Sequence, residues 1–249
     1  MLGSSLVLAA LLAAQQPAFL HTITPGTPGA RALVTADLGY GERLFAGIGP
    51  ERWEQRLGAQ LALGSRFTLV ASGGFTRQNA SGAVEVLASV LPSSSRAFAA
   101  LGLGGMLDYT GSAVALGRVT AGLRGPQWEI AGNLRLERSL AAASARRDAL
   151  DVITSVGVSR RLGRPLRVGL EAVGEDLEGI FDPNEAEGGA KLLLGPTLAI
   201  APTAHWQFIL GGGPVLRLSQ SSVIGGTTVP RDLITRSGYV IRSSVGYTW

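Results

Sequence analysis

The sequence predicts an all-β fold: a closed antiparallel barrel of about twelve membrane-crossing strands, with ten to fourteen compatible with the pattern. Three observations support this prediction. Apolar and polar residues alternate along the chain from residue 31 onward, and the connections between alternating runs are short and long in turn. In addition, 46% of the residues are hydrophobic and only 16% are charged, against about 25% charged in an average soluble domain. The chain therefore has few charges with which to cover a surface exposed to water.

The first sixteen residues are expected to be a signal peptide. Residues 6–14 form an apolar run, which is far shorter than the roughly 20 residues of a membrane-spanning helix. Small and polar residues follow this run, as they do before a cleavage site. No Lys or Arg precedes it, so the signal would be atypical, and an apolar N-terminal helix is the alternative.

Each expected strand is a run in which successive side chains point to opposite faces. In the run 127–138, for example, Trp128 and Ile130 share one face and Glu129 lies on the other. Pro196 and Pro214 fall inside two of the runs, where proline usually indicates a bulge or a strand end, so the count is uncertain by one hairpin. The expected strands are residues 31–38, 52–63, 66–77, 82–91, 96–107, 112–124, 127–138, 150–161, 165–175, 188–200, 204–217 and 238–249.

The connections follow a second pattern. Every even-numbered strand is followed by a short turn, whereas the connections after odd-numbered strands are generally longer and reach about twenty residues between 218 and 237. Short turns at one end and long loops at the other are typical of a barrel threaded into a membrane from one side. The short turns are at residues 64–65, 92–95, 125–126, 163–165 and 201–204.

A soluble sandwich or barrel would alternate in the same way. Its apolar face would have to point inward, where a dozen strands carrying Leu, Val, Phe and Trp would leave a wide and poorly filled interior. Its outer surface would then consist of Gly, Ala, Ser and Thr with few charges. If the apolar face meets lipid instead, both problems disappear, and a closed barrel leaves no unpaired backbone edge in the bilayer. We therefore expect an apolar exterior and a polar lumen.

Charged residues of the inward face define the candidate functional site, the lumen. Because an isolated buried charge is costly, these residues must be paired or hydrated. Interlocked side chains would close the lumen, whereas charges on opposite walls would set a transverse field across a narrow channel. The inward-facing Gly58, Gly102, Gly122 and Gly169 would leave space, which favours a channel. The charged residues are Arg56, Arg118, Arg135, Arg167, Lys191, Arg242, Glu54, Glu85, Glu129, Glu137 and Glu171.

The sequence favours no catalytic residue, metal site or cofactor. It contains no cysteine, and its two histidines, His21 and His205, are far apart. We expect His205, beside the turn at 201–204, to lie at the membrane interface. The acidic stretch 174–189 lacks the ligand spacing of a calcium loop and is expected to be solvated surface charge. The net charge of +4 is spread without a Lys or Arg cluster, which argues against nucleic acid as a partner.

The chain ends on the alternating stretch SGYVIRSSVGYTW, in which Trp249 is the last residue and Tyr239, Ile241, Val245 and Tyr247 are in phase with it. This ending resembles the closing strand of bacterial outer-membrane β-barrel proteins, a porin-like class found in Gram-negative bacteria. The resemblance implies outer-membrane lipid as the surroundings and the barrel assembly machinery of that membrane as a partner during biogenesis. Independently of the resemblance, Trp and Tyr favour the interface between lipid and water.

Together, these observations divide the chain into a signal peptide (1–16), a periplasmic N-terminal segment (17–30) and an outer-membrane barrel (31–249). The expected function is passive passage of small hydrophilic solutes. One alternative is a structural or surface-interaction barrel whose lumen is closed by its ion network. Another is a lipid-modifying outer-membrane enzyme, although the long-loop rim lacks the histidine that such an enzyme would need. The sequence leaves the solute and the oligomeric state open.

Overall fold

The structure, a computed structural model, describes residues 18–25, 31–41, 53–76, 80–92, 95–108, 111–140, 150–163, 165–181, 190–219 and 237–249. The expected signal peptide lies outside the described residues. Within the described ranges, no helix is long and apolar enough to cross a membrane.

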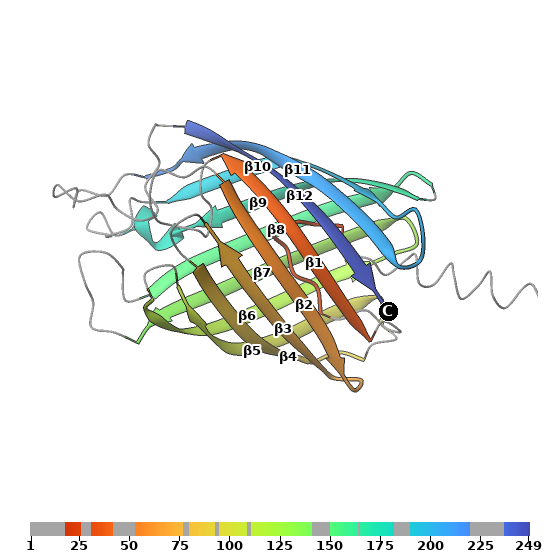
Figure 1. Cartoon of the computed structure of the whole chain (residues 1–249), viewed down its shortest axis with the longest axis horizontal. Coiled ribbons are helices and arrows are strands. Elements are labelled where there is room, and N and C mark those ends of the chain that lie inside the picture. The colour runs from red at the N-terminus through yellow and green to blue at the C-terminus, as the bar shows by residue number, and fades with distance from the viewer. Residues whose placement is uncertain are drawn as a thin grey trace, which may run out of the picture.

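Twelve antiparallel strands form one closed barrel, which confirms the predicted fold (Figure 1). Each strand pairs with its neighbours in the sequence, and β1 pairs with β12 from Leu33 opposite Thr248 to Gly41 opposite Val240. A short 3₁₀ helix, η1 (Leu177–Ile180), follows β9. The strands are β1 (Ala32–Gly41), β2 (Trp53–Leu63), β3 (Phe67–Phe75), β4 (Ala80–Ser89), β5 (Ala97–Leu107), β6 (Ala113–Arg124), β7 (Trp128–Ser139), β8 (Leu150–Arg161), β9 (Leu166–Glu175), β10 (Lys191–Ile200), β11 (Trp206–Arg217) and β12 (Ser237–Thr248).

The short turns and the long connections lie at opposite ends of the barrel, as predicted. The turns β2–β3, β4–β5, β6–β7, β8–β9 and β10–β11 gather at the end that also holds the C-terminus (Figure 1). We call this the short-turn end and the opposite one the long-loop end. All strands are 9 to 12 residues long, which matches the length that a tilted strand needs to cross the hydrocarbon core.

The apolar face points outward, as the alternation predicts. In β7, Trp128 is 50% exposed and Ile130 is 47% exposed, whereas Glu129 and Ala131 between and after them are 4% and 1% exposed. Large apolar side chains are exposed on the other strands as well, the reverse of a soluble protein, and Leu103 of β5 reaches 76% exposure. Large apolar side chains on the outside of a closed barrel are stable only against lipid. The molecule is therefore built to span a membrane.

Aromatic side chains gather where strands near the β1–β12 closure end. At the short-turn end, the ring centroid of Tyr247 lies 5.0 Å from that of Trp206 and 5.9 Å from that of Trp249. At the long-loop end, the centroids of Tyr40 and Trp53 are 4.7 Å apart. Aromatic groups at two levels are what the two interfaces of a bilayer favour.

Pro196 and Pro214 lie within β10 and β11 rather than at their ends. Paired residues on either side keep one register, from Leu193 opposite Val215 to Thr197 opposite Gly211, but the three positions between them are not paired across these two strands. On its other side, each proline remains opposite a residue of the next strand. The missing proline N–H groups thus interrupt a single ladder locally, and neither a bulge nor a lost strand results.

Candidate functional site: the barrel lumen

The lumen contains a cavity of about 210 Å³ lined by residues of most strands and by residues 19–24. All eleven charged residues predicted to face inward lie on the inner side of the wall. Ten of them are largely buried, and the side chain of Arg56 is 23% exposed. The cavity has a mixed lining, with polar groups such as Thr35, Gln60, Ser72 and Ser155 beside apolar ones.

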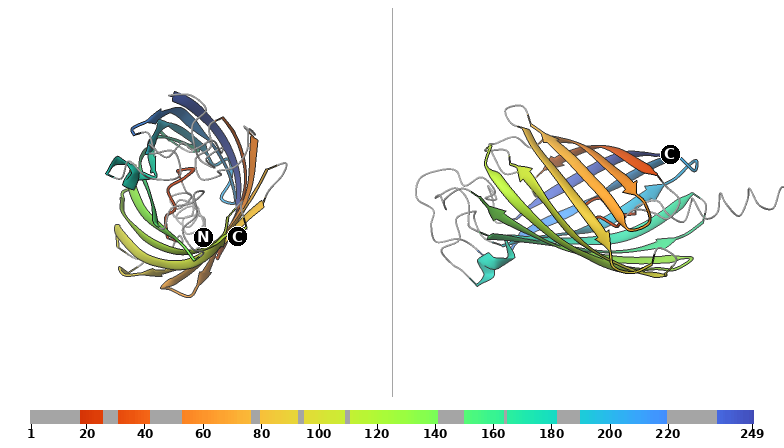
Figure 2. Two further views of the ribbon diagram at one scale, coloured as in Figure 1. Left: turned by 90° about the vertical axis from the view of Figure 1, so that its left-hand side faces the viewer. Right: turned by 90° about the horizontal axis from the view of Figure 1, so that it is seen from below.

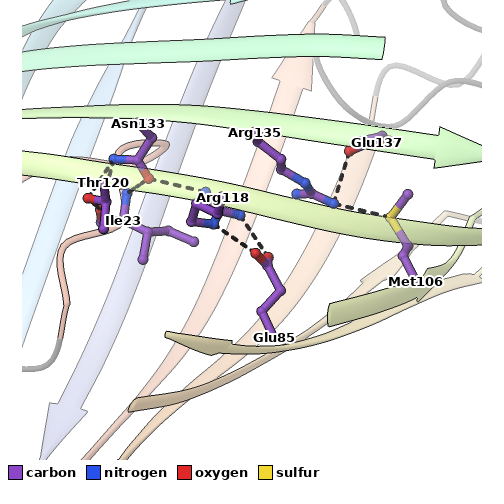
Figure 3. A network of polar contacts seen from close by, with 8 residues as sticks. All are labelled: Ile23, Glu85, Met106, Arg118, Thr120, Asn133, Arg135 and Glu137. Atoms are coloured by element: carbon purple, nitrogen blue, oxygen red, sulfur yellow. Dashed lines mark hydrogen bonds and ion pairs between the residues drawn. The ribbon is translucent and has the colours of Figure 1, made fainter. Parts of the chain in front are cut away.

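The central charge group of the lumen is the pair of Arg118 on β6 and Glu85 on β4 (Figure 3). Arg118 donates from Nε and Nη2 to the two carboxylate oxygens of Glu85, at 2.8 and 2.7 Å. Its Nη1 donates to Oδ1 of Asn133 at 3.1 Å. Both charged side chains are only 4% exposed. This two-point geometry is the strongest arrangement of an arginine and a carboxylate.

The charges pair along the wall rather than across the lumen. Arg118 and Glu85 are on strands that flank β5, and Arg242 and Glu54 are on strands that flank β1. Arg167 on β9 and Glu129 on β7 likewise pair across the strand between them, β8, and Glu129 also pairs with Arg124 on the adjacent β6. Two further pairs join residues two apart on one strand: Arg56 with Glu54 and Arg135 with Glu137. Neither outcome considered from the sequence, an interlocked centre or a transverse field, describes this pattern.

Glycines on the intervening strands make room for the long pairs. A Cβ at Gly102 of β5 would lie 3.1 Å from Cβ of Arg118, and one at Gly39 of β1 would lie 3.2 Å from Nη2 of Arg242. The expectation that inward glycines leave open space for solute is therefore wrong at Gly102, where Arg118 and Leu87 fill the space, at Gly122, beside Phe98, and at Gly169, beside Thr197. Gly58, beside Thr35, does line the cavity.

Near the long-loop end, the inner face of the barrel combines an apolar cluster with the predicted Lys191. Val173, Leu193, Val215 and Val240 form a buried cluster on β9 to β12. Beside it, Lys191 Nζ lies 3.5 Å from Oδ2 of Asp176, and both side chains are completely buried.

The predicted solvated character of the acidic stretch is wrong for its described part. Glu175 and Asp176 are fully buried, and Oε2 of Glu178 accepts the backbone N–H of Val152 at 2.8 Å. Because β9 continues as far as Glu175, these carboxylates belong to the barrel wall and its first turn. Residues 182–189 of the stretch lie outside the described residues.

Residues 18–25, which we call the N-terminal segment, lie inside the barrel (Figure 2). This is the described part of the stretch that we expected to be a periplasmic segment. The carboxylate of Glu171 on β9 accepts three successive backbone N–H groups, from Leu20 at 3.2 Å, His21 at 2.9 Å and Thr22 at 2.7 Å. The Nδ1 atom of His21 lies 3.1 Å from Oε2 of the same carboxylate.

Asn133 on β7, two strands away from Glu171, holds the next residue of this segment. Its Nδ2 donates to the carbonyl oxygen of Ile23 at 2.8 Å, and its Oδ1 accepts the backbone N–H of Ile23 at 3.2 Å. Thr120 donates to the same carbonyl at 3.0 Å, and Arg124 donates to the carbonyl of Pro25 at 3.3 Å. Since Asn133 also accepts from Arg118, the segment is connected to the central charge group (Figure 3).

Little in the sequence indicates this arrangement. The N-terminal segment is short, and the partners of its hydrogen bonds are 97 to 151 residues away in the chain. Asn133 and Thr120 were visible only as polar members of the inward face, without a role. A possible signal was that the inward face of β7 carries an amide among its charges, since a buried amide needs both donors and acceptors around it.

The other predicted residues also have defined places. His205 lies in the β10–β11 turn at the short-turn end, where its Nδ1 is 2.8 Å from the carbonyl oxygen of Thr248 and its ring stacks on Tyr247. The expected assembly signal, Tyr239, Ile241, Val245, Tyr247 and Trp249, lies on the outer face of β12, and its members are 37% to 55% exposed. Within the described residues, no group of three His, Cys, Asp or Glu side chains is placed to hold a metal ion.

Comparison with known proteins shows which solved structures share this fold. No protein-family model matches the chain, and no curated protein sequence matches it. Among solved structures, it is similar to the NanC porin, with a TM-score of 0.63 and 10% identity over 87% of this chain and 100% of that one. It is also similar to the KdgM porin, with a TM-score of 0.60 and 9% identity over 87% of this chain and 99% of that one. At these identities, the likeness shows a shared porin fold, in agreement with the predicted architectural class.

Proposed function

We propose that this protein is an outer-membrane channel for passive passage of small hydrophilic solutes. The observation that carries the proposal is the combination of an apolar exterior with a partly polar cavity of about 210 Å³ enclosed by twelve strands. A cavity of this size accommodates only small solutes in the arrangement described. The shared fold with two porins supports the same function and the same membrane.

The charge pattern suggests weak selection between cations and anions. Seven basic side chains of the described wall each have a carboxylate partner within 3.5 Å, so these charges are compensated locally. Selective channels present rings or rows of like charge to the solute. One similar structure is the KdgM porin in complex with disordered oligogalacturonate. A polyanion of that kind would find each arginine of this lumen already paired, so we favour uncharged polar solutes.

The test is conductance of the purified protein in planar bilayers, together with swelling of vesicles in solutions of uncharged sugars of increasing size. We expect measurable conductance, a reversal potential close to zero in a potassium chloride gradient, and faster swelling for smaller sugars. A folded barrel that neither conducts nor admits the smallest sugar would contradict the proposal.

The second candidate is a structural or surface-interaction barrel with a closed lumen. The N-terminal segment inside the barrel favours it, because it occupies part of the lumen that the ion pairs along the wall leave open. In that case the lumen would be a core, and the long loops would carry the function. The sugar experiment separates the two candidates. We assign the chain no reaction, because His21 is engaged with Glu171 and His205 lies at the short-turn end against a backbone carbonyl.

A further inference from the structure

We propose that the lumen wall carries a binding site for peptide backbone, that its occupant is the chain's own N-terminal segment, and that the occupied site closes the channel. The gating part of this proposal rests on the proposed channel function, whereas the peptide site does not. Two groups on one part of the wall form the polar half of the site: the carboxylate of Glu171 on β9 and the amide of Asn133 on β7, the two strands that flank β8.

The polar half of the site recognises backbone rather than side chains. Glu171 binds three successive N–H groups, and Asn133 binds both the N–H and the C=O of Ile23, as a neighbouring strand would. Hydrogen bonds to an ionised carboxylate are about twice as strong as those between neutral groups. Glu171 is 3% exposed, so its charge depends on these donors for stabilisation inside the barrel.

The apolar half of the site is shaped to the side chains of the N-terminal segment. A Cβ at Gly157 would lie 2.5 Å from the ring of Phe19, and one at Gly211 would lie 2.8 Å from Cδ1 of Leu20. Phe19 packs against Ala131 in a buried cluster, and Ile23 packs against a second cluster that contains Leu87. The wall therefore has its smallest residues where this segment has its largest ones.

The position of the site places it across the path of a solute. Its contacts begin near the middle of the barrel, at the sixth of ten residues of β9 (Glu171), the sixth of twelve of β7 (Asn133) and the eighth of twelve of β8 (Gly157). They extend to the short-turn end, where Arg124, the last residue of β6, donates to the carbonyl oxygen of Pro25. The cavity is bordered by Phe19 through Thr24. A solute that leaves the cavity toward the short-turn end must pass this segment, so its release would widen the passage without opening the wall.

The experiment uses the barrel lacking residues 18–25 and a fluorescent peptide of the removed sequence, AFLHTITP. The twelve strands close on one another through β1 and β12 without this segment, so we expect the shortened barrel to fold. Binding of the peptide is measured by anisotropy in detergent micelles, and conductance is measured in planar bilayers. We expect the shortened barrel to bind the peptide, to conduct better than the full chain, and to return toward the full-chain level when the peptide is added.

Two sets of substitutions sharpen the experiment. Glu171→Gln in the shortened barrel should weaken peptide binding about tenfold or more, because it removes the charge that receives three N–H groups. Glu137→Gln, on the same inner wall but paired with Arg135, should leave the peptide affinity unchanged. In the full chain, Phe19→Cys with Gly157→Cys should form a disulfide, since a Cβ at Gly157 lies 2.9 Å from Cγ of Phe19. The chain has no other cysteine, so conductance should rise only after reduction.

The outcomes separate the two proposals. Peptide binding that depends on Glu171, with no conductance from any folded variant, would support the site and overturn both the channel function and the gating. Equal conductance of full and shortened barrels, with no peptide binding, would overturn this inference and leave the channel function standing. The disulfide variant decides the case if the shortened barrel does not fold: conductance that is the same before and after reduction would overturn the gating.

Discussion

The buried pair of Arg118 and Glu85 should contribute strongly to stability, and a double-mutant cycle measures how strongly. Glu85→Gln leaves Arg118 with only its bond to Asn133, and Arg118→Gln leaves a carboxylate that is 4% exposed without its cation. Breaking a buried pair by removing one partner costs about 3–5 kcal/mol. Because Arg118 and Glu85 line a cavity that admits water, we expect about 3 kcal/mol for each single variant. The double variant should cost little more than one of them, so the coupling energy should be about 3 kcal/mol.

The assay is urea unfolding of the barrel in lipid vesicles, followed by the fluorescence of its four tryptophans. Arg56→Gln is the control, because the Arg56 side chain is 23% exposed and its ion pair with Glu54 is more accessible to water than the pair of Arg118 and Glu85. It should cost about 1 kcal/mol or less. If the two single variants each cost under about 1 kcal/mol and their effects add, the pair is hydrated, and the description of the wall as a set of buried ion pairs is refuted.

Three further predictions concern the wall and the ending of the chain. Leu103→Arg, at an outward position midway along β5 with 76% exposure, should lower the free energy of unfolding in vesicles by about 2–4 kcal/mol. Leu63→Arg, at the end of β2, should lower it by about 1 kcal/mol or less. Equal costs would contradict the membrane orientation. Gly102→Ala should destabilise the barrel by about 1–3 kcal/mol, because its Cβ would lie 2.5 Å from Cδ2 of Leu87. The control is Gly105→Ala on the same strand, whose Cβ would have its nearest contact at 3.7 Å and which should change stability by less than about 1 kcal/mol. Trp249→Ala should reduce the fraction of folded barrel in cells, measured by its heat-dependent shift on gels, yet allow purified protein to refold in detergent; a normal folded fraction in cells would show that the aromatic ending is not needed for assembly.

The strands, their order and their orientation could be predicted because a period of two assigns each residue to a face. Lipid outside and a lumen inside then determine which face is apolar, so Trp128 already indicates the outside of β7 and Glu129 its inside. The length of each run gives the strand, and the turn residues give its ends to within about three positions. Even the prolines of β10 and β11 do not disturb this, because the register is the same on both sides of the interruption.

Partners inside the lumen could not be predicted, because alternation does not determine which residues of different strands lie at the same height. That Arg118 meets Glu85 depends on the stagger of three strands and on Gly102 between them. The sequence showed the charges and the glycine separately. It therefore suggested open space where the structure has an ion pair.

The N-terminal segment escaped prediction for a different reason. Residues 18–25 have no strand or helix of their own, and their conformation depends on groups in β6, β7 and β9. Only the assembled barrel brings Glu171 and Asn133 together against one short peptide. A contact set that exists only after the fold is complete leaves no local pattern in the sequence.

The arrangement of the wall and the N-terminal segment indicates which part of the molecule moves when a solute passes. Widening the barrel at its centre would separate buried ion pairs such as that of Arg118 and Glu85, each costing about 3–5 kcal/mol when broken, and would open backbone ladders as well. Releasing the N-terminal segment breaks its hydrogen bonds and uncovers a few apolar side chains; the hydrogen-bond partners are Glu171, Asn133, Thr120 and Arg124. Water replaces most of those hydrogen bonds once the lumen fills. The wall is thus the rigid part and the peptide inside it the replaceable part. In the proposed channel, the charges that the sequence suggested as the selective element would serve mainly to hold the wall, while control of passage would lie with a segment that we expected outside the barrel.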